Sequence, residues 1–437
     1  MVATAGPRIA LVVVGSRGDA QPFVALAEQL RLAGALPVLL THAEHAGLAA
    51  AHGIDFRPMP GDPRDLLATR AGLELLESRS QLRALGRLRD LGAHLFDDVT
   101  QALERELPGF DAVVFSTLAV SAYHVGEALG IPRIWAVLQP VSPTRQWPSL
   151  LVSPGRDLGP LNYPSHYLLD LVGWRLFGAS IAEYRHRVGL PALGWIGPGR
   201  RVRAELPVVA GWSQVLAPRP ADWPRHVHVS GAWQLASRAA MPAEVEAFLS
   251  DGPPPVYMGL GSATVAEPDE VSAALLGAAR DVGVRVLLSG GWAGLAEVGN
   301  GASAQVLAVG ELPHDRVFGG CSAVVHHAGA GTAQTALAAG AVAVSLPLWG
   351  DQPFWARRLH ALGVAPAPVP RAKWSRSRIA AALARAVGEP WRLDRAHAAA
   401  AAMATEAGAA GAARTVLQFA TTSPSPRPLG GRGSRRS

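Results

Sequence analysis

The chain has 437 residues, of which 49% are hydrophobic and 17% are charged. This composition excludes disorder for most of the chain and permits a large core, and the length suggests two or three domains. The formal net charge is +6, but four of the positive charges are arginines that follow Thr422. The basic balance therefore does not indicate nucleic-acid binding.

A single cysteine, Cys321, excludes an intramolecular disulfide. No basic segment with an apolar stretch and a cleavage site precedes Ile9, and no apolar run approaches the ~18 residues that span a bilayer. We therefore expect a cytoplasmic protein with at most peripheral membrane contact. Lys373 is the only lysine, a bias typical of a GC-rich bacterial genome.

The first half of the chain alternates aliphatic runs with amphipathic stretches. The run Ile9–Val14 ends at Gly15, and apolar residues then recur at helical spacing over Gln21–Ala33 and again over Gln81–Glu106. This alternation predicts parallel strands covered by helices on both faces. Further strands are expected at Pro37–Leu40, Ala112–Phe115, Arg133–Val137 and Val208–Ala210.

A proline-rich stretch separates this series from a second one, so we expect an interdomain linker at residues 218–241. Strands of the second series are expected at Val256–Gly259, Val284–Ser289, Val306–Val309, Ala323–His326 and Ala343–Pro347. The predicted fold class is α/β, with two tandem Rossmann-like doubly wound domains at residues 1–217 and 242–420. The last helices are expected to pack back on the first domain, and residues 421–437 to form a disordered basic tail. Ligands are expected in the cleft at the carboxyl ends of the strands.

The strongest functional signal is the run VVHHAGAGT over Val324–Thr332. A strand enters, small residues turn the chain and a helix leaves, so unpaired backbone N–H groups and the positive end of a helix dipole converge. Gly329 and Gly331 let an anion approach the backbone closely. For His327 we favour a hydrogen bond to an oxyanion, whereas for His326, still in the strand, we favour a structural bond to a neighbouring carbonyl.

A polar pair, Asp351 and Gln352, follows the strand expected at Ala343–Pro347 and is flanked by aromatic residues. Together these side chains accept hydrogen bonds from several hydroxyls and donate to them, as a bound sugar requires. Capping of the next helix by Asp351 explains the pair equally well. The chemistry of the residues leaves both interpretations open.

The run HHAGAGTAQTALAAGAVAVSLPLWGDQPFWARRLHALGVAP, which begins at His326, resembles the donor-binding signature of GT-B glycosyltransferases, close to the sterol and antibiotic-aglycone glucosyltransferases. The resemblance implies a UDP- or TDP-hexose as donor. One departure is Ala328, where the family usually has glycine and where a methyl group is expected to crowd the phosphate turn. The implied donor contacts are His327, Gly329, Gly331 and Thr332 on the diphosphate, with Asp351 and Gln352 on the sugar.

Further donor contacts follow from the same resemblance. Ser262 corresponds to a family serine that faces the diphosphate. Related plant enzymes have a tryptophan that stacks on the base, but here the stretch reads Glu311-Leu312-Pro313-His314. The base is then expected to be held by the backbone near Leu312 and by Trp292, for which partly buried packing is the alternative.

The turn after the first strand reads GSRGDAQP, over Gly15–Pro22. Helix capping is the ordinary role of an aspartate in such a turn. The stretch resembles the GSRGDVQP opening of the same glycosyltransferases, which implies that Asp19 is the general base and that Ser16 and Arg17 lie on the acceptor side. A carboxylate within ~3 Å of the attacking hydroxyl takes its proton.

We expect no metal ion and no cofactor besides the nucleotide-sugar co-substrate. The sequence lacks the Asp-x-Asp pair that holds a divalent ion in the other large glycosyltransferase fold. Charge on the leaving diphosphate would then be stabilised by the helix dipole, backbone amides and His327. Displacement by a single nucleophile predicts inversion at the anomeric carbon.

Aromatic residues are frequent between Leu138 and Leu193, and Trp147 is one of them. They are predicted to line a pocket for a small lipophilic acceptor or to contact a membrane surface, although helix packing explains them about as well. A dinucleotide-dependent oxidoreductase is disfavoured because the turn after Val14 lacks G-x-G-x-x-G spacing.

Two alternatives stay open. A sugar-nucleotide 2-epimerase of the same architecture would bind the same donor, and a non-catalytic glycosyltransferase-like activator is kept open by Ala328. The sequence does not determine the oligomeric state.

Overall fold

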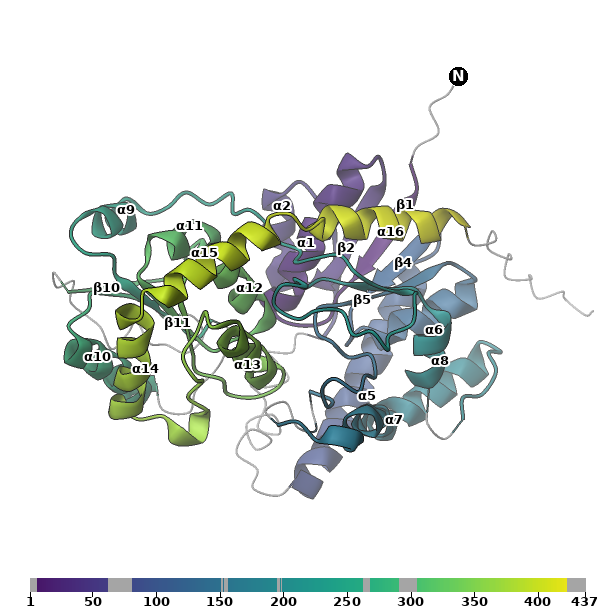
Figure 1. Cartoon of the computed structure of the whole chain (residues 1–437). Coiled ribbons are helices and arrows are strands. Elements are labelled where there is room, and N and C mark those ends of the chain that lie inside the picture. Colours follow the sequence, from purple (N-terminus) through teal and green to yellow (C-terminus); the bar gives the residue numbers. More distant parts are fainter. Residues whose placement is uncertain are drawn as a thin grey trace, which may run out of the picture.

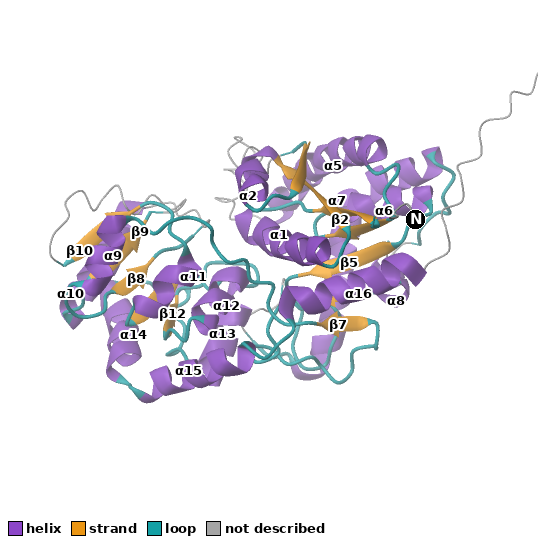
Figure 2. Ribbon diagram, turned by 90° about the horizontal axis from the view of Figure 1, so that it is seen from above, coloured by secondary structure: helices purple, strands orange, loops and turns teal. Residues whose placement is uncertain are grey.

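The structure, a computed structural model, describes residues 6–61, 81–150, 152, 156–194, 197, 199–261, 268–290 and 305–422. It contains two parallel α/β domains in tandem, which confirms the predicted fold class (Figures 1 and 2). None of the helices in these ranges combines the length and the apolar character that crossing a bilayer requires.

The first domain is built on a parallel sheet with the strand order β3-β2-β1-β4-β5-β6-β7 in the described residues. Its strands are β1 (Arg8–Val12), β2 (Leu36–His42), β3 (Asp55–Met59), β4 (Ala112–Phe115), β5 (Arg133–Val137), β6 (Val208–Ala210) and β7 (Val227–Val229). Its helices are α1 (Arg17–Leu32), α2 (Ala46–Ala51), α5 (Gln81–Glu106), α6 (Val120–Leu129), α7 (Asn162–Arg187) and α8 (Gly199–Glu205), and a short 3-10 turn, η1 (Ala43–His45), follows β2.

The second domain has the sheet order β10-β9-β8-β11-β12 in the described residues. Its strands are β8 (Val256–Met258), β9 (Val286–Ser289), β10 (Val306–Val309), β11 (Ala323–His326) and β12 (Ala343–Ser345). Its helices are α9 (Ala243–Ser250), α10 (Pro268–Val282), α11 (His314–Val317), α12 (Ala330–Ala338), α13 (Gln352–Leu362), α14 (Arg376–Gly388) and α15 (Trp391–Met403).

Two strands escaped the sequence analysis, and both lack a continuous apolar run. β3 is an edge strand of sequence DFRPM whose residues are mostly exposed. β7 has only three residues, and it lies inside the range 218–241 that was predicted as linker. The first sheet therefore extends to Val229, and the predicted linker began too early.

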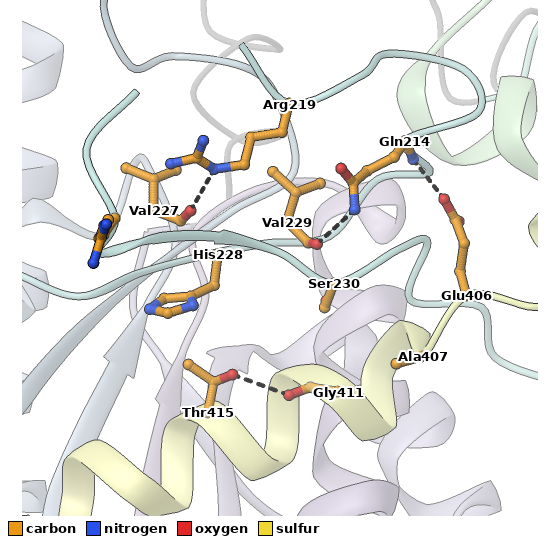
Figure 3. Close-up of a pocket in the computed structure, with 11 residues that line it drawn as sticks. Gln214, Arg219, Val227, His228, Val229, Ser230, Glu406, Ala407, Gly411 and Thr415 are labelled. Atoms are coloured by element: carbon orange, nitrogen blue, oxygen red, sulfur yellow. Dashed lines mark hydrogen bonds between the residues drawn. The ribbon is translucent and has the colours of Figure 1, made fainter. Parts of the chain in front are cut away.

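The C-terminal helix α16 (Gly408–Thr422) leaves the second domain and packs along α1 of the first (Figure 1). The crossover is held by the Gly408 N–H, which donates to the Ser230 carbonyl at 2.7 Å, and by the Gln214 N–H, which donates to Glu406 at 2.7 Å. A cavity of about 550 Å³ lies between β7 and the start of α16 (Figure 3). The chain thus links its two domains twice, once after β7 and once before α16.

Aromatic side chains form the core of the contact between the domains. Trp212 of the first domain lies 6.4 Å from Trp355 of α13 between ring centroids. Arg358 of the same helix donates to the Leu216 carbonyl at 2.7 Å. The buried cluster that contains these residues continues into both domains, so the domain orientation is fixed by apolar packing.

The strand orders place one topological switch point in each sheet, between β1 and β4 and between β8 and β11. At such a point, loops leave neighbouring strands in opposite directions and open a crevice beyond the carboxyl ends. The turn with Asp19 follows β1, and the turn with His327 follows β11. The two motifs of the sequence therefore lie at the two positions where this fold binds ligands.

Candidate active site

The turn between β1 and α1 requires a glycine at its first position. Gly15 has a φ of +147°, and a Cβ built on it would lie 2.3 Å from Asp19 Oδ2. No side chain fits there, because the Asp19 carboxylate occupies the space. The glycine thus allows the aspartate to fold back over the turn that precedes its own helix.

Asp19 is held by the residue that begins the helix. The Ser16 N–H donates to Asp19 Oδ2 at 2.9 Å, and the Ser16 hydroxyl donates to the same oxygen at 3.1 Å. No donor among the described residues reaches Oδ1, which leaves this oxygen for a ligand. Burial raises the pKa of Asp19, while the bonds from Ser16 and the nearby His45 act in the opposite direction. Asp19 therefore takes part in capping its helix through Oδ2, while its Oδ1 stays free.

In the second domain, the imidazole of His327 is wedged between two glycines. A Cβ at Gly329 would lie 2.4 Å from His327 Nε2, and one at Gly261 would lie 3.0 Å from Cε1. The absence of a side chain at position 329 thus makes room for the histidine ring. At Gly331, a Cβ would meet no atom within 4 Å. The open approach to the first turn of α12 is therefore at Gly331 and its neighbour Thr332, which is half-buried.

Ala328 takes a left-handed backbone conformation, with a φ of +63°. Its side chain is fully buried, and its N–H donates to His326 Nδ1 at 3.0 Å. The methyl group therefore lies inside the protein and does not crowd the turn as expected. Its cost is backbone strain, on the order of 1–2 kcal/mol for a residue other than glycine. The predicted carbonyl bond of His326 is replaced by this bond from a backbone N–H.

Three buried histidines surround the start of α12. Burial, together with the nearby His314, lowers the pKa of His327 to about 4. Burial also lowers the pKa of His314 to about 4 and that of His326 to about 3. All three are neutral at pH 7. A diphosphate at this position would stabilise their charged forms, because an opposite charge nearby raises the pKa of a histidine.

Asp351 and Gln352 lie at the start of α13, after β12. The pKa of Asp351 is raised to about 6, mainly by burial and in smaller part by the charge of Asp19. The indole N–H of Trp355, which donates to Asp351 at 2.8 Å, acts in the opposite direction. Asp19 and Asp351 therefore lie close enough to interact although they belong to different domains. The Gln352 side-chain oxygen accepts the N–H of Leu348 at 2.8 Å, which leaves its amide N–H groups for a ligand.

Other predicted site residues have different surroundings. Arg17 is exposed and forms an ion pair with Glu311 of the second domain. Leu312 is buried in the core of that domain, so only its backbone is available to a base. Ser262 and Trp292 lie outside the described residues.

Trp147 is buried and takes part in the domain contact. Its ring packs against Trp223, with centroids 6.2 Å apart, and against Phe354 of α13, at 5.4 Å. The interpretation as a pocket-lining residue is corrected to the packing alternative.

Sequence reasoning also missed Glu311 and His314 as side chains of the site. His314 lies near His327 and Glu311 pairs with Arg17, and no local sequence pattern indicates either contact.

The site thus combines an accessible helix start in one domain with a free carboxylate oxygen in the other. This arrangement is typical of a transferase that activates a nucleophile with one domain and binds a phosphate-bearing donor with the other. The comparisons with known proteins define the class more closely.

Two family models match the chain. Residues 9–147 match the glycosyltransferase family 28 N-terminal domain, and residues 293–418 match the erythromycin biosynthesis protein CIII-like C-terminal domain. O-mycaminosyltylonolide 6-deoxyallosyltransferase of Streptomyces fradiae is 34% identical over 424 residues, which are 95% of this chain and 98% of the relative. The chain therefore belongs to the glycosyltransferase family that these two domain models and this relative represent, and it is a glycosyltransferase.

Sterol 3-beta-glucosyltransferases are also similar. One from Arabidopsis thaliana is 34% identical over 84% of this chain, and the chain spans 61% of that protein's length. Among solved structures, the calicheamicin glycosyltransferase CalG4 matches with a TM-score of 0.70 at 17% identity, covering 96% of this chain and 100% of that one. The glycosyltransferase VinC in complex with dTDP matches with a TM-score of 0.65 at 19% identity, covering 94% and 99%.

The contrast between Gly329 and Gly331 predicts that alanine substitution changes the free energy of unfolding differently at the two positions. Gly329→Ala places a methyl group against the His327 ring and should lower the free energy of unfolding by about 1–3 kcal/mol, as overpacking does. Gly331→Ala points into open space within a helix and should leave stability unchanged or slightly raised. Urea denaturation of both variants measures the difference, and equal effects would contradict the packing described for His327.

The buried histidines predict acid sensitivity. In the unfolded chain they bind protons near their ordinary pKa of 6.5, whereas the folded chain binds them only near pH 3–4. The free energy of unfolding should therefore fall as pH decreases from about 7 to 4. The raised pKa of Asp351 opposes this between about pH 4 and 6, but it is one group against three.

Urea titrations at pH 7 and 4.5 test this dependence. His326→Gln should reduce it, and the matched control His186→Gln, at an exposed position, should not. Stability that rises on acidification would contradict the electrostatic description.

Proposed function

We propose that the protein is an inverting, metal-independent glycosyltransferase. It moves a hexose from a UDP- or TDP-sugar to a hydroxyl of a small lipophilic acceptor, with Asp19 as the general base. The observation that carries the proposal is that the Asp19 turn meets the second domain: Arg17, two residues before Asp19, pairs with Glu311, and the charge of Asp19 raises the pKa of Asp351. An acceptor-side base and a sugar-binding carboxylate must lie this close if the hydroxyl is to reach the anomeric carbon.

The donor diphosphate binds at the start of α12. The first N–H groups of this helix have no partner within it, and the positive end of its dipole faces the same space. His327 provides a neutral imidazole beside Gly329, and Thr332 adds a hydroxyl. The dTDP complex of VinC, a protein of the same fold, supports a nucleoside diphosphate as the ligand.

The transfer is a single displacement. The acceptor oxygen forms a bond to the anomeric carbon as the bond from that carbon to the diphosphate oxygen breaks, and the hydroxyl proton passes to Asp19. Negative charge on the departing diphosphate is stabilised by the α12 amides and His327. Inversion at the anomeric carbon follows from attack opposite the leaving group, so an α-linked donor gives a β-glycoside.

Two exposed apolar side chains support a lipophilic acceptor. Leu118 follows β4 and is 65% exposed, and Trp349 follows β12 and is 67% exposed. Ser116 accepts the Val14 N–H at 3.2 Å, which holds the turn before Leu118 beside the turn of Asp19. Trp349 lies two residues before Asp351. The relatives named for sterols and for O-mycaminosyltylonolide agree with a lipophilic acceptor such as a sterol, terpenoid or polyketide.

Replacing the base tests the proposal. Asp19→Asn should lower kcat by ~10²-fold or more while donor binding changes little, because the amide keeps the shape but accepts no proton. The assay follows nucleoside diphosphate release from UDP- and TDP-sugars with a steroid and polyketide panel, in the presence of EDTA. Release should require an acceptor and should persist in EDTA.

Each other outcome of this assay has a defined meaning. Unchanged kcat in Asp19→Asn overturns the assignment of the base, and loss of release in EDTA overturns metal independence. Interconversion of UDP-sugars without an acceptor would support the epimerase alternative. No turnover with any pair, despite nucleotide binding, would support the activator alternative.

The exposed tryptophan gives a separate prediction for the acceptor. Trp349→Ala should raise KM for a lipophilic acceptor about 10-fold and leave KM for the donor unchanged, because an apolar contact of one large side chain contributes roughly 1.5 kcal/mol or more. Trp391→Ala, at an exposed tryptophan at the start of α15, is the matched control. An equal effect of both substitutions on acceptor KM would contradict the placement of the acceptor.

A further inference from the structure

Two buried histidines hold the peptide groups on either side of Gly15. His42 ends β2 and His45 ends η1, and both side chains are almost fully buried. The Gly15 N–H donates to His42 Nε2 at 3.4 Å, and His45 Nε2 lies 3.2 Å from the Gly15 carbonyl oxygen. The backbone N–H and carbonyl groups of Gly15 thus each contact a histidine ring nitrogen.

The two contacts require opposite roles of the rings. His42 Nε2 accepts a hydrogen bond, so it carries no proton. His45 Nε2 faces a carbonyl oxygen, so it must donate. A Glu44 carboxylate oxygen, which can only accept, also lies 3.3 Å from the same nitrogen. His42 therefore acts through a lone pair and His45 through an N–H group.

Gly15 connects the two histidines to Asp19. Its Cα faces the carboxylate so closely that a Cβ would lie 2.3 Å from Oδ2. Its carbonyl belongs to the same peptide group as the Ser16 N–H, which donates to Asp19 Oδ2 at 2.9 Å. The His45 bond to that carbonyl therefore fixes the direction of the N–H that aims the carboxylate. The charge of His45 also acts on Asp19 directly and lowers the pKa of that carboxyl.

We propose that His42 and His45 are positioning residues for the reaction, which hold the Gly15 turn so that Asp19 Oδ1 faces the acceptor hydroxyl. The inference rests on the proposed role of Asp19 as general base. Neither histidine transfers a proton to or from the substrate. Loss of either bond would let the turn rotate, and a displacement near 1 Å at a reacting group costs up to ~10²-fold in rate.

The test compares a polar and an apolar replacement at each position. Glutamine places an amide where the ring nitrogen was, so His42→Gln can still accept and His45→Gln can still donate. Leucine can do neither. We expect His42→Leu and His45→Leu to lower kcat by about 10- to 100-fold with donor KM unchanged, and both glutamine variants to keep most of kcat.

His52→Leu is the matched control for stability. His52 is also buried in the first domain, and it pairs with Glu28 at 2.9 Å. Its replacement should lower the melting temperature as much as the other leucine variants do while leaving kcat unchanged. Nucleoside diphosphate affinity, measured by calorimetry, should be the same in all of these variants.

The pH profile separates the charge of His45 from its hydrogen bond. The titratable group that lowers the pKa of Asp19 is His45 of η1, and Asp19 in turn raises the pKa of Asp351 in the second domain. His45→Gln keeps the hydrogen bond but removes the charge, so the acid limb of kcat/KM should move to higher pH while the plateau stays. A merely structural histidine would not move this limb.

Asp19→Asn in the same assay distinguishes the two levels of the proposal. If it leaves kcat unchanged, the proposed base is wrong. If it lowers kcat as expected but the leucine variants at 42 and 45 match His52→Leu, the positioning role is wrong and the base stands. Equal loss of kcat in the leucine and glutamine variants would also overturn the inference, because the hydrogen bonds would then be irrelevant.

Discussion

Asp19 and Asp351 come from different domains, and the charge of one raises the pKa of the other. This proximity depends on the orientation of the two parallel sheets, which also brings Arg17 of the first domain to Glu311 of the second. The aromatic contact around Trp212 and Trp355 fixes that orientation, and α16 adds a second connection by returning to α1. The proposed reaction needs both domains, because the start of α12 belongs to the second domain and Asp19 belongs to the first.

The candidate active site combines a strained backbone position with buried ionisable side chains. Ala328 stands in a left-handed conformation, His327 is buried with a lowered pKa, and Asp351 is buried with a raised one. Each of these features lowers stability, and the strands around them are fully buried and apolar, which offsets the cost. The three buried histidines of the site are neutral at pH 7 before the donor binds. An incoming diphosphate changes these equilibria, so binding and protonation are coupled.

The sequence predicted the parts of the structure that depend on local pattern. Runs such as Ala112–Phe115 and Ala323–His326 became strands with the predicted bounds, because a strand buried on both faces must be continuously apolar. β3 and β7 were missed because an edge strand and a three-residue strand carry no such run. The range Gln81–Glu106 was predicted as a helix with its final bounds, since its apolar residues recur over many turns.

Contacts between distant residues set the limit for the site. Asp19 and His327 were identified from motifs, and their turns were placed correctly at the strand ends. The ion pair of Arg17 with Glu311 joins residues 294 positions apart, and no local pattern announces it. Gly329 was predicted to let an anion approach the backbone, and the structure adds a packing constraint that no motif shows, because a side chain at this position would meet the His327 ring. Trp147 was predicted to line a pocket, but burial against Trp223 and Phe354 depends on the domain orientation, which the sequence does not reveal.

A crystal structure of the ternary complex with UDP or TDP and a bound acceptor tests the central claim most directly. We expect the diphosphate against the first N–H groups of α12 and His327, and the acceptor hydroxyl within roughly 3 Å of Asp19 Oδ1. A diphosphate bound elsewhere, or a hydroxyl whose nearest base is another side chain, would contradict a single centre built by both domains.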